Sequence, residues 1–157
     1  MSLNKLTILL IALLLPFGLI SCSDNSTGVE EEEEEETTQV VYALSFAEGD
    51  GTATFYVDLT GVEGFDPATH SVYITGSLLG WPEPGTDPDR QEMVLIEDET
   101  TEIPVVTPEA TGDVQYKYFS DFVAAGWDGG EWAGDPNRSA TLTAGAEIQD
   151  VWGNQPE

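Results

Sequence analysis

Alternating hydrophobic and polar residues mark the best-defined strand of the chain, at residues 52–59. Ala53, Phe55, Val57 and Leu59 fall on one face, whereas threonine, tyrosine and aspartate residues fall on the other. Because an extended chain turns successive side chains to opposite faces, this pattern predicts a strand with one buried face. We therefore expect Phe55 and Val57 to lie in the core.

A hairpin is expected just before this strand. Residues 41–46 form a second β-rich run, and Glu48-Gly49-Asp50-Gly51 between the two supplies residues that tolerate a positive φ. Further short β-rich runs follow, most of them separated by proline or glycine clusters: residues 71–75, 92–96, 102–106, 114–119, 139–143 and 147–151. Short strands without an amphipathic helical stretch predict an all-β fold, a two-sheet antiparallel sandwich of immunoglobulin-like appearance.

The first 21 residues have the pattern of a bacterial lipoprotein signal. Asn4-Lys5 gives a short basic start, residues 6–20 form an apolar run, and Leu19-Ile20-Ser21-Cys22 reads as a lipobox. The run is shorter than the ~20 residues that a membrane-spanning helix needs. We therefore expect cleavage before Cys22 and lipidation of its thiol. An uncleaved anchor, or a plain secretory signal with a chance cysteine, is the alternative.

Cys22 is the only cysteine, so the mature domain has no partner for an internal disulfide. Residues 22–38 contain seven consecutive glutamates, Glu30 to Glu36. Like charges at this density repel and nothing apolar offsets the entropy of ordering them, which predicts a disordered tether. Acidic residues behind a lipidated cysteine also resemble the surface-export signals of some Gram-negative lipoproteins. This favours the cell surface of the outer membrane, with the periplasmic face and a simple solvated spacer as alternatives.

The composition is strongly acidic. The formal charge of the chain is −26, and residues 38–157 alone carry −19, with Arg90, Lys117 and Arg138 as their cations. Such a charge disfavours nucleic acid and anionic membranes as partners, whereas it does not disfavour a neutral polysaccharide. A saline habitat or bound calcium is another explanation of the acidity, but no Asp-x-Asp-x-Asp-Gly loop is present. We expect no metal and no cofactor.

These features divide the chain into a signal peptide at residues 1–21, an acidic tether at 22–38 and a single domain at 39–157. The domain has about 115 residues, which is enough for one hydrophobic core.

Trp81, Trp127 and Trp132 fall in loops rich in glycine and proline. The axial C–H groups of a glucose ring form an apolar face, to which an indole offers a large, rigid surface at small entropic cost. These tryptophans are therefore candidate sugar platforms, and the alternative is that they cap the core at the ends of the sandwich. We assign Trp152, at the close of the last strand, to such core packing.

Three short segments carry a family resemblance. They are Gly76-Ser77-Leu78-Leu79-Gly80-Trp81, Tyr116-Lys117-Tyr118 and Glu131-Trp132-Ala133-Gly134-Asp135-Pro136-Asn137-Arg138. Over residues 40–152 the chain resembles the starch-binding carbohydrate-binding modules of family 20 and the related glycogen-binding modules. In these modules a Gly-Ser…Gly…Trp loop, a Tyr-Lys-Tyr/Phe strand and a Trp…Asp-Pro-Asn-Arg loop follow one another. The resemblance implies a β-sandwich that binds an α-glucan.

The resemblance also implies roles for single residues. Trp81 and Trp132 would form the platform of a sugar site, and Lys117 and Asn137 would hydrogen-bond the sugar hydroxyls. Two platforms set at an angle would fit the curvature of an α-1,4-glucan.

Two features depart from the family pattern. The usual Gly-Asn-Trp turn is here Gly80-Trp81-Pro82, and Trp127-Asp128-Gly129-Gly130 looks like an addition that brings a further candidate ligand contact, Trp127. Arg138 is read as a structural partner of an acidic neighbour. Asn137 stays open between contacting a ligand and closing its own turn.

The sequence shows no arrangement of catalytic residues. His70 is the only histidine, and the glycines at 76 and 80 do not give the Gly-x-Ser-x-Gly spacing of a nucleophile elbow. One histidine and a lipidated cysteine are too few for a zinc site, and carboxylate pairs arise by chance in so acidic a domain. We therefore expect a surface lipoprotein, not an enzyme, that binds a polysaccharide such as starch or glycogen.

The competing hypothesis is a structural or adhesive surface lipoprotein whose sandwich binds a matrix or a partner, such as an outer-membrane protein. The two hypotheses differ in what they require of Trp81 and Trp132. Exposed indoles that face one groove favour sugar, whereas indoles buried in the core favour a partner.

Overall fold

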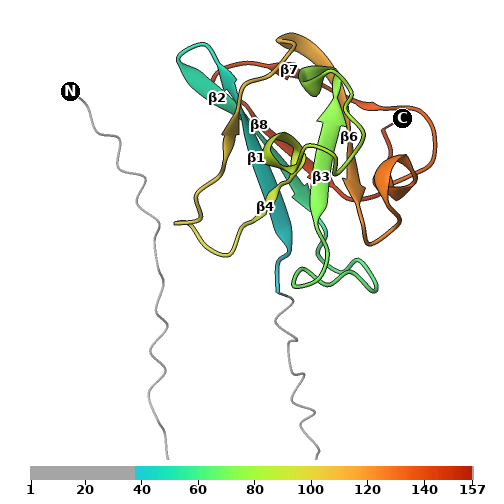
Figure 1. Cartoon of the computed structure of the whole chain (residues 1–157). Helices are drawn as coiled ribbons and strands as arrows, with labels where there is room; N and C mark the ends of the chain where they lie inside the picture. Colours follow the sequence, from blue (N-terminus) through green and yellow to red (C-terminus); the bar gives the residue numbers. More distant parts are fainter. Residues whose placement is uncertain (1–37, 157) are drawn as a thin grey trace, which may run out of the picture. The chain divides into compact units, whose positions relative to one another are not determined.

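The computed structural model describes residues 38–156 (Figure 1). The predicted signal peptide, Cys22 and the acidic tether up to residue 37 lie outside the described residues, as does Glu157. Over residues 38–156, none of the helices has the length and apolar character needed to cross a membrane.

The described residues form short strands joined by three helical turns. In chain order these elements are β1 Val41–Glu48, β2 Gly51–Asp58, β3 Val72–Gly76, η1 Ser77–Leu79, α1 Pro88–Gln91, β4 Val94–Leu95, β5 Val105–Val106, β6 Gly112–Ser120, η2 Gly126–Gly129, β7 Arg138–Leu142 and β8 Glu147–Val151. One sheet has the order β4-β1-β2-β8, with β5 also paired to β1, and the other has the order β3-β6-β7. The predicted all-β, two-sheet sandwich is confirmed.

Each predicted β-rich run contains one strand, but β4 and β5 are shorter than predicted. β4 pairs with Tyr42 and Ala43, and β5 pairs with Ser45 and Phe46 on the same edge of β1. Because β4 and β5 share one edge of β1, each can pair with only part of that edge. The pairs β1/β5 and β2/β8 are parallel, and the other pairings are antiparallel.

The predicted hairpin joins β1 to β2. Glu48 lies opposite Gly51, so Gly49 and Asp50 form a two-residue turn. Gly49 has a φ of 55°, whereas Asp50 does not have a positive φ. A positive φ at the first central position alone is what a type II′ hairpin turn requires, and glycine adopts it without strain.

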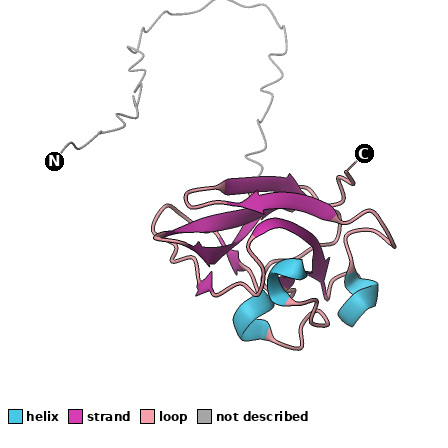
Figure 2. Cartoon of the chain, turned by 90° about the horizontal axis from the view of Figure 1, so that it is seen from above, coloured by secondary structure: helices cyan, strands magenta, loops and turns pink. Residues whose placement is uncertain are grey.

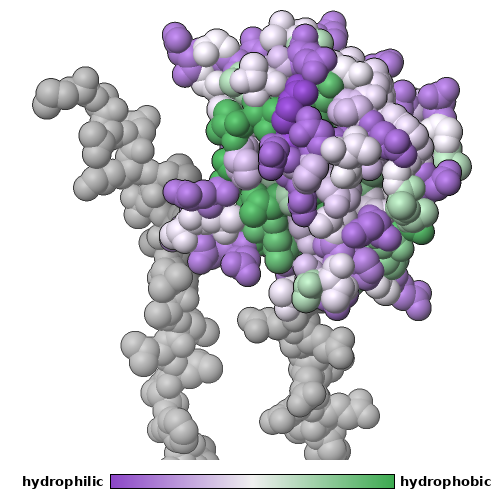
Figure 3. Space-filling model, in the orientation of Figure 1, coloured by the Kyte–Doolittle hydropathy of each residue, from purple (hydrophilic) through white to green (hydrophobic). Residues whose placement is uncertain are grey.

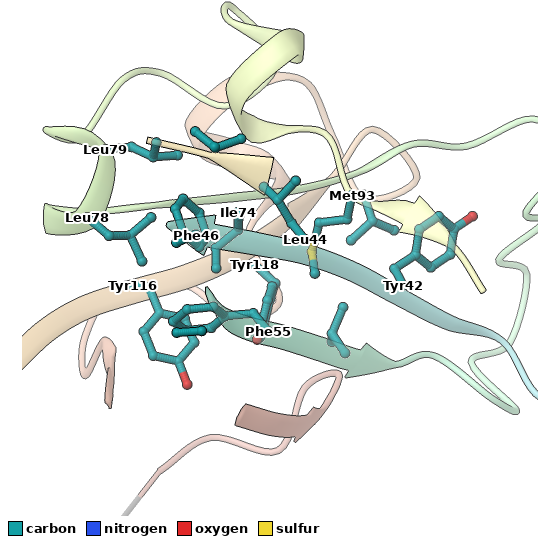
Figure 4. Close-up of a cluster of buried hydrophobic side chains, with 14 of the residues drawn as sticks. Tyr42, Leu44, Phe46, Phe55, Ile74, Leu78, Leu79, Met93, Tyr116 and Tyr118 are labelled. Carbon is teal, nitrogen blue, oxygen red and sulfur yellow. The ribbon is translucent and has the colours of Figure 1, made fainter. Parts of the chain in front are cut away.

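The core lies between the two sheets, with the apolar face of β2 at its centre (Figure 4). Ala53, Phe55 and Val57 have no exposed surface, as the alternation predicted. The ring of Phe55 packs edge-on against Phe46 at 5.5 Å and, across the sandwich, against Tyr116 at 4.8 Å. Each such edge-to-face pair adds about 0.5–1.5 kcal/mol to the stabilisation that burial of the rings provides.

The three helical turns all contact β3 or β6 and lie together on one side of the strands (Figure 2). Leu78 and Leu79 of η1 are buried in the core, so the chain after β3 is fixed to the sandwich. A side chain at Gly76 would collide with the backbone of Gln115 and Tyr116 on β6, which explains glycine there. The loop that carries Trp81 therefore leaves the sheet from a rigid base.

Candidate functional site: a tryptophan-lined groove

The candidate residues singled out from the sequence lie together. Trp81, Lys117, Trp127, Trp132 and Asn137 all line one groove with a volume of about 630 Å³. This volume falls within the range of natural ligand pockets. The groove extends over the outer face of β6, because Lys117 points away from the core into which its neighbours in sequence point. Its other lining residues are Phe119, Val123, Asp128, Gly130, Glu131, Ala133, Gly134 and Asp135.

Trp81 has an unusual backbone. Its φ is 59°, the only positive φ of a non-glycine residue within residues 38–156, and it follows Gly80 at a φ of 74°. A bulky side chain in the left-handed region is strained, and such strain persists only where the surroundings impose it. The indole is 36% exposed at the groove.

Hydrogen bonds on both sides hold Trp81 in place. Its backbone N–H donates to the carbonyl of Gly76 over 2.9 Å. The next carbonyl, of Pro82, accepts from Thr75 Oγ1 at 2.8 Å and from Gln91 Nε2 at 3.2 Å. Thr75 and Gln91 are fully buried, so these two donors are rigid. The strained turn is therefore preorganised before any ligand arrives.

Trp132 is half-buried, and two cations lie over its ring. Lys117 Nζ is 4.8 Å and Arg138 Cζ is 4.9 Å from the ring centroid. The indole N–H donates to the carbonyl of Pro136 over 3.0 Å. Part of this ring is thus occupied within the protein, which leaves less of it for a ligand than the sequence alone suggested.

Lys117 is more buried than most lysine residues, with 5% of its surface exposed. Its ammonium group donates to the carbonyl of Gly134 over 2.7 Å and so pins the loop that follows Trp132. Burial lowers the pKa of Lys117, although the charges of Glu131 and Asp135 act to raise it. An ammonium group has three donors, so donors besides the one to Gly134 are available for a sugar hydroxyl.

Arg138 is structural, as its sequence context predicted. It forms a bidentate ion pair with Glu131, with Nε–Oε1 at 2.9 Å and Nη2–Oε2 at 2.7 Å, and its Nη1 lies 2.8 Å from Asp150 Oδ1. The carboxylate of Glu131 is fully buried. Asp150 also accepts the hydroxyls of Tyr116 and Tyr118, each over 2.9 Å. This network joins β7 of one sheet to β8 of the other, directly beneath the groove loop.

Trp127 and Asn137 are the remaining candidates in the groove, the first exposed and the second half-buried. Trp127 is 49% exposed, and its indole meets the ring of Phe119 edge-on at 5.8 Å. The side chain of Asn137 makes no hydrogen bond to another described residue, so the turn closure through its own amide does not form. Trp152 lies outside the groove and packs against the core, as expected.

Sequence reasoning missed Phe119, Asp128 and Asp135 as groove residues. Phe119 carried a signal, because it is the apolar residue at an outward-facing position of an otherwise polar face of β6. The two aspartates lie next to candidates in the sequence, Asp128 after Trp127 and Asp135 before Pro136-Asn137, but acidic loop residues occur throughout this domain and neither stood out. In the described part of the chain, no group of three or more histidine, cysteine or acidic side chains is placed to hold a metal ion.

Comparison of the chain with protein-family models, curated proteins and solved structures finds no match. The function is therefore inferred from the groove and from the residues that build it.

Proposed function

We propose that the domain is a polysaccharide-binding module that holds an α-glucan, such as starch or glycogen, against its loop tryptophans. The observation that carries this proposal is the strained and clamped Trp81, which lines one groove with Trp127 and Trp132. A left-handed backbone costs a non-glycine residue about 1–2 kcal/mol, and such strain concentrates at functional sites. Core packing gives no reason to retain it, because this indole is not in the core.

The chemistry of the groove suits a sugar chain. Indole faces offer rigid apolar surface to the C–H face of each ring, so little side-chain entropy is lost on binding. The amide of Asn137 can both donate to and accept from hydroxyls at the ring edge, and Lys117 has N–H groups besides the one given to Gly134. A half-exposed site of this kind buries little area, so we expect dissociation constants of roughly 10 μM to 1 mM.

Calorimetry with maltoheptaose and β-cyclodextrin tests the proposal on the mature chain without its lipid. Trp81→Ala and Trp132→Ala should each weaken binding about tenfold or more, because each removes a stacking surface. Trp152→Ala is the control that should lower stability first. Absence of heat and of retardation in amylose-containing gels, for a folded protein, would reject the α-glucan.

The proposal includes attachment to the outer membrane through Cys22, on the cell surface or on the periplasmic face. It is supported by the basic start, the apolar run and the lipobox of the sequence. Mass spectrometry of the mature N-terminal peptide should find a diacylated Cys22 at its first position. A free amine at Ser21 or Ser23 would reject the anchor.

The adhesive alternative would use another surface. Val105 is 58% exposed, and the half-buried run of residues 94–96 lies beside it on the outer edge of β1. In Figure 3 a hydrophobic area interrupts the hydrophilic surface near β4. If a folded domain binds no glycan, cross-linking from this edge in intact cells is the experiment that would find a partner protein.

A further inference from the structure

We infer that the groove selects its ligands by charge: it favours a glycan that carries ammonium groups and rejects one that carries carboxylates. This inference rests on the proposed function and specifies the ligand class of the same site. The residues that set the preference are Asp128 and Asp135, together with the indoles of Trp81 and Trp127.

Two carboxylates of the groove are uncompensated. Asp128 and Asp135 both line it and are exposed, and neither side chain forms an ion pair or a hydrogen bond with another described residue. The field of Asp135 reaches into the site, since it acts on the ammonium group of Lys117. A ligand in the groove therefore meets the negative charge of these two side chains.

The cations of the domain offset only part of this charge. Lys117 lines the groove and is bonded to the carbonyl of Gly134, so its single positive charge faces the two aspartates. Arg138 is held between Glu131 and Asp150, and Arg90 lies outside the groove beside Asp87 and Glu109. Lys117 can offset one of the two aspartate charges, so a carboxylate ligand still meets net negative charge in the groove, within a domain whose formal charge is −19.

The exposed indoles are open to a cation. Within residues 38–156, cation–π contacts involve Trp132 and Tyr118, whereas the rings of Trp81 and Trp127 have none. Tryptophan is the aromatic side chain that attracts cations most strongly, and the effect grows where water is displaced. An ammonium group on a sugar would lie between these indole faces and the two carboxylates, while its ring stacks as a neutral ring would.

Three cyclodextrins of one shape test the preference on the mature chain: β-cyclodextrin, its 6-amino-6-deoxy derivative and its 6-carboxymethyl derivative. At low salt the amino derivative should bind about three- to tenfold more tightly than the neutral ring, and the carboxymethyl derivative correspondingly more weakly. This spread of affinities among the three rings should shrink as the ionic strength rises to 1 M, because salt screens exposed charges.

Variants assign the effect to the groove. Asp128→Asn with Asp135→Asn should abolish the spread, so that the three rings bind this variant with equal affinity. The matched control, Asp50→Asn with Asp89→Asn, removes the same charge from the β1–β2 turn and from α1, and should keep the spread. Equal loss in both double variants, or a spread that survives in the first, would overturn the inference, because overall charge or another site would then be responsible.

A lysine tetramer separates sugar from peptide. It should bind at least tenfold more weakly than the amino cyclodextrin, and equal binding would overturn the inference in favour of a site for basic peptides. Binding of all three cyclodextrins with equal affinity would reject the charge preference and leave the proposed function standing. Binding of none of them by the folded chain would reject both.

Discussion

Among single residues, Trp81 combines a bulky side chain with a left-handed backbone at a φ of 59°. Hydrogen bonds to Gly76 on one side and to Pro82 on the other maintain this conformation. Much of the strain comes from the Cβ atom, which alanine shares with tryptophan and glycine lacks, so the backbone strain and the indole can be separated by mutation.

We expect Trp81→Gly to be about 1 kcal/mol more stable than Trp81→Ala, because glycine adopts a positive φ at no steric cost. Both variants lack the indole and should lose glucan binding to the same extent. Urea denaturation and calorimetry measure the two effects. An alanine variant as stable as the glycine variant would contradict the left-handed conformation.

Phe55 and Thr54 test the register of β2. Phe55→Ala should cost about 3–5 kcal/mol, since the ring is fully buried against Phe46 and Tyr116. Thr54→Ala should cost about 1 kcal/mol, through loss of the 2.8 Å hydrogen bond between Thr54 Oγ1 and Ser45 Oγ. Thermal unfolding compares them, and equal costs would contradict the assigned faces.

Among the elements, β7 and β8 belong to different sheets, and the network of Glu131, Arg138 and Asp150 joins them. The same arginine lies over the ring of Trp132, so the network supports both the sandwich and the groove wall. Removing one member of a buried ion pair leaves the other without compensation, which costs more than the pair contributes.

Arg138→Met should therefore destabilise the domain by about 3–5 kcal/mol, because it leaves the buried carboxylate of Glu131 without its ion-pair partner. Glu131→Gln in the same chain should recover part of that loss, since it removes the stranded charge. Chemical denaturation of the wild type, both single variants and the double variant gives the coupling energy. Strictly additive costs would show that the two side chains do not interact.

At the scale of the whole molecule, buried tyrosines link stability to alkaline pH. Burial and the nearby Asp150 raise the pKa of Tyr116 and of Tyr118 above the ordinary value of 10.0. In the unfolded chain these hydroxyls ionise near pH 10, whereas in the folded chain they keep their protons. The unfolded state thus loses protons first, and stability present below pH 10 is lost as the pH rises.

Above pH 10 we expect the free energy of unfolding to fall by about 1.4 kcal/mol per pH unit for each such tyrosine. Burial lowers the pKa of Lys117 and so works in the opposite direction, but it is a single group. Denaturation at several alkaline pH values measures the slope. The double variant Tyr116→Phe with Tyr118→Phe should make this slope shallower. An unchanged slope would show that general charge repulsion, and not these tyrosines, causes the loss of stability at alkaline pH.

The local pattern of the sequence determined which segments are strands. The alternation of hydrophobic and polar residues predicted β2 and its buried face, and the Glu48–Gly51 segment predicted the hairpin. Each β-rich run contains one strand. The motif segments likewise selected Trp81, Lys117, Trp132 and Asn137, and the glycine-rich loop before the last segment added Trp127; the structure brings all five to one groove. These features can be predicted from the sequence because the alternation of side chains along a strand and the residues that form a turn are both local.

Tertiary structure alone decided how these parts meet. The parallel pairings of β5 and β8, the burial of Lys117 and the cations over Trp132 all depend on contacts between distant segments. The same holds for the meeting of Asp128 and Asp135 in one groove with Trp81 and Trp127, because these residues come from separate loops. The exposure of a side chain and the pairing of its charge both depend on which residues pack against it. Those residues come from distant parts of the chain, so only the folded structure shows them.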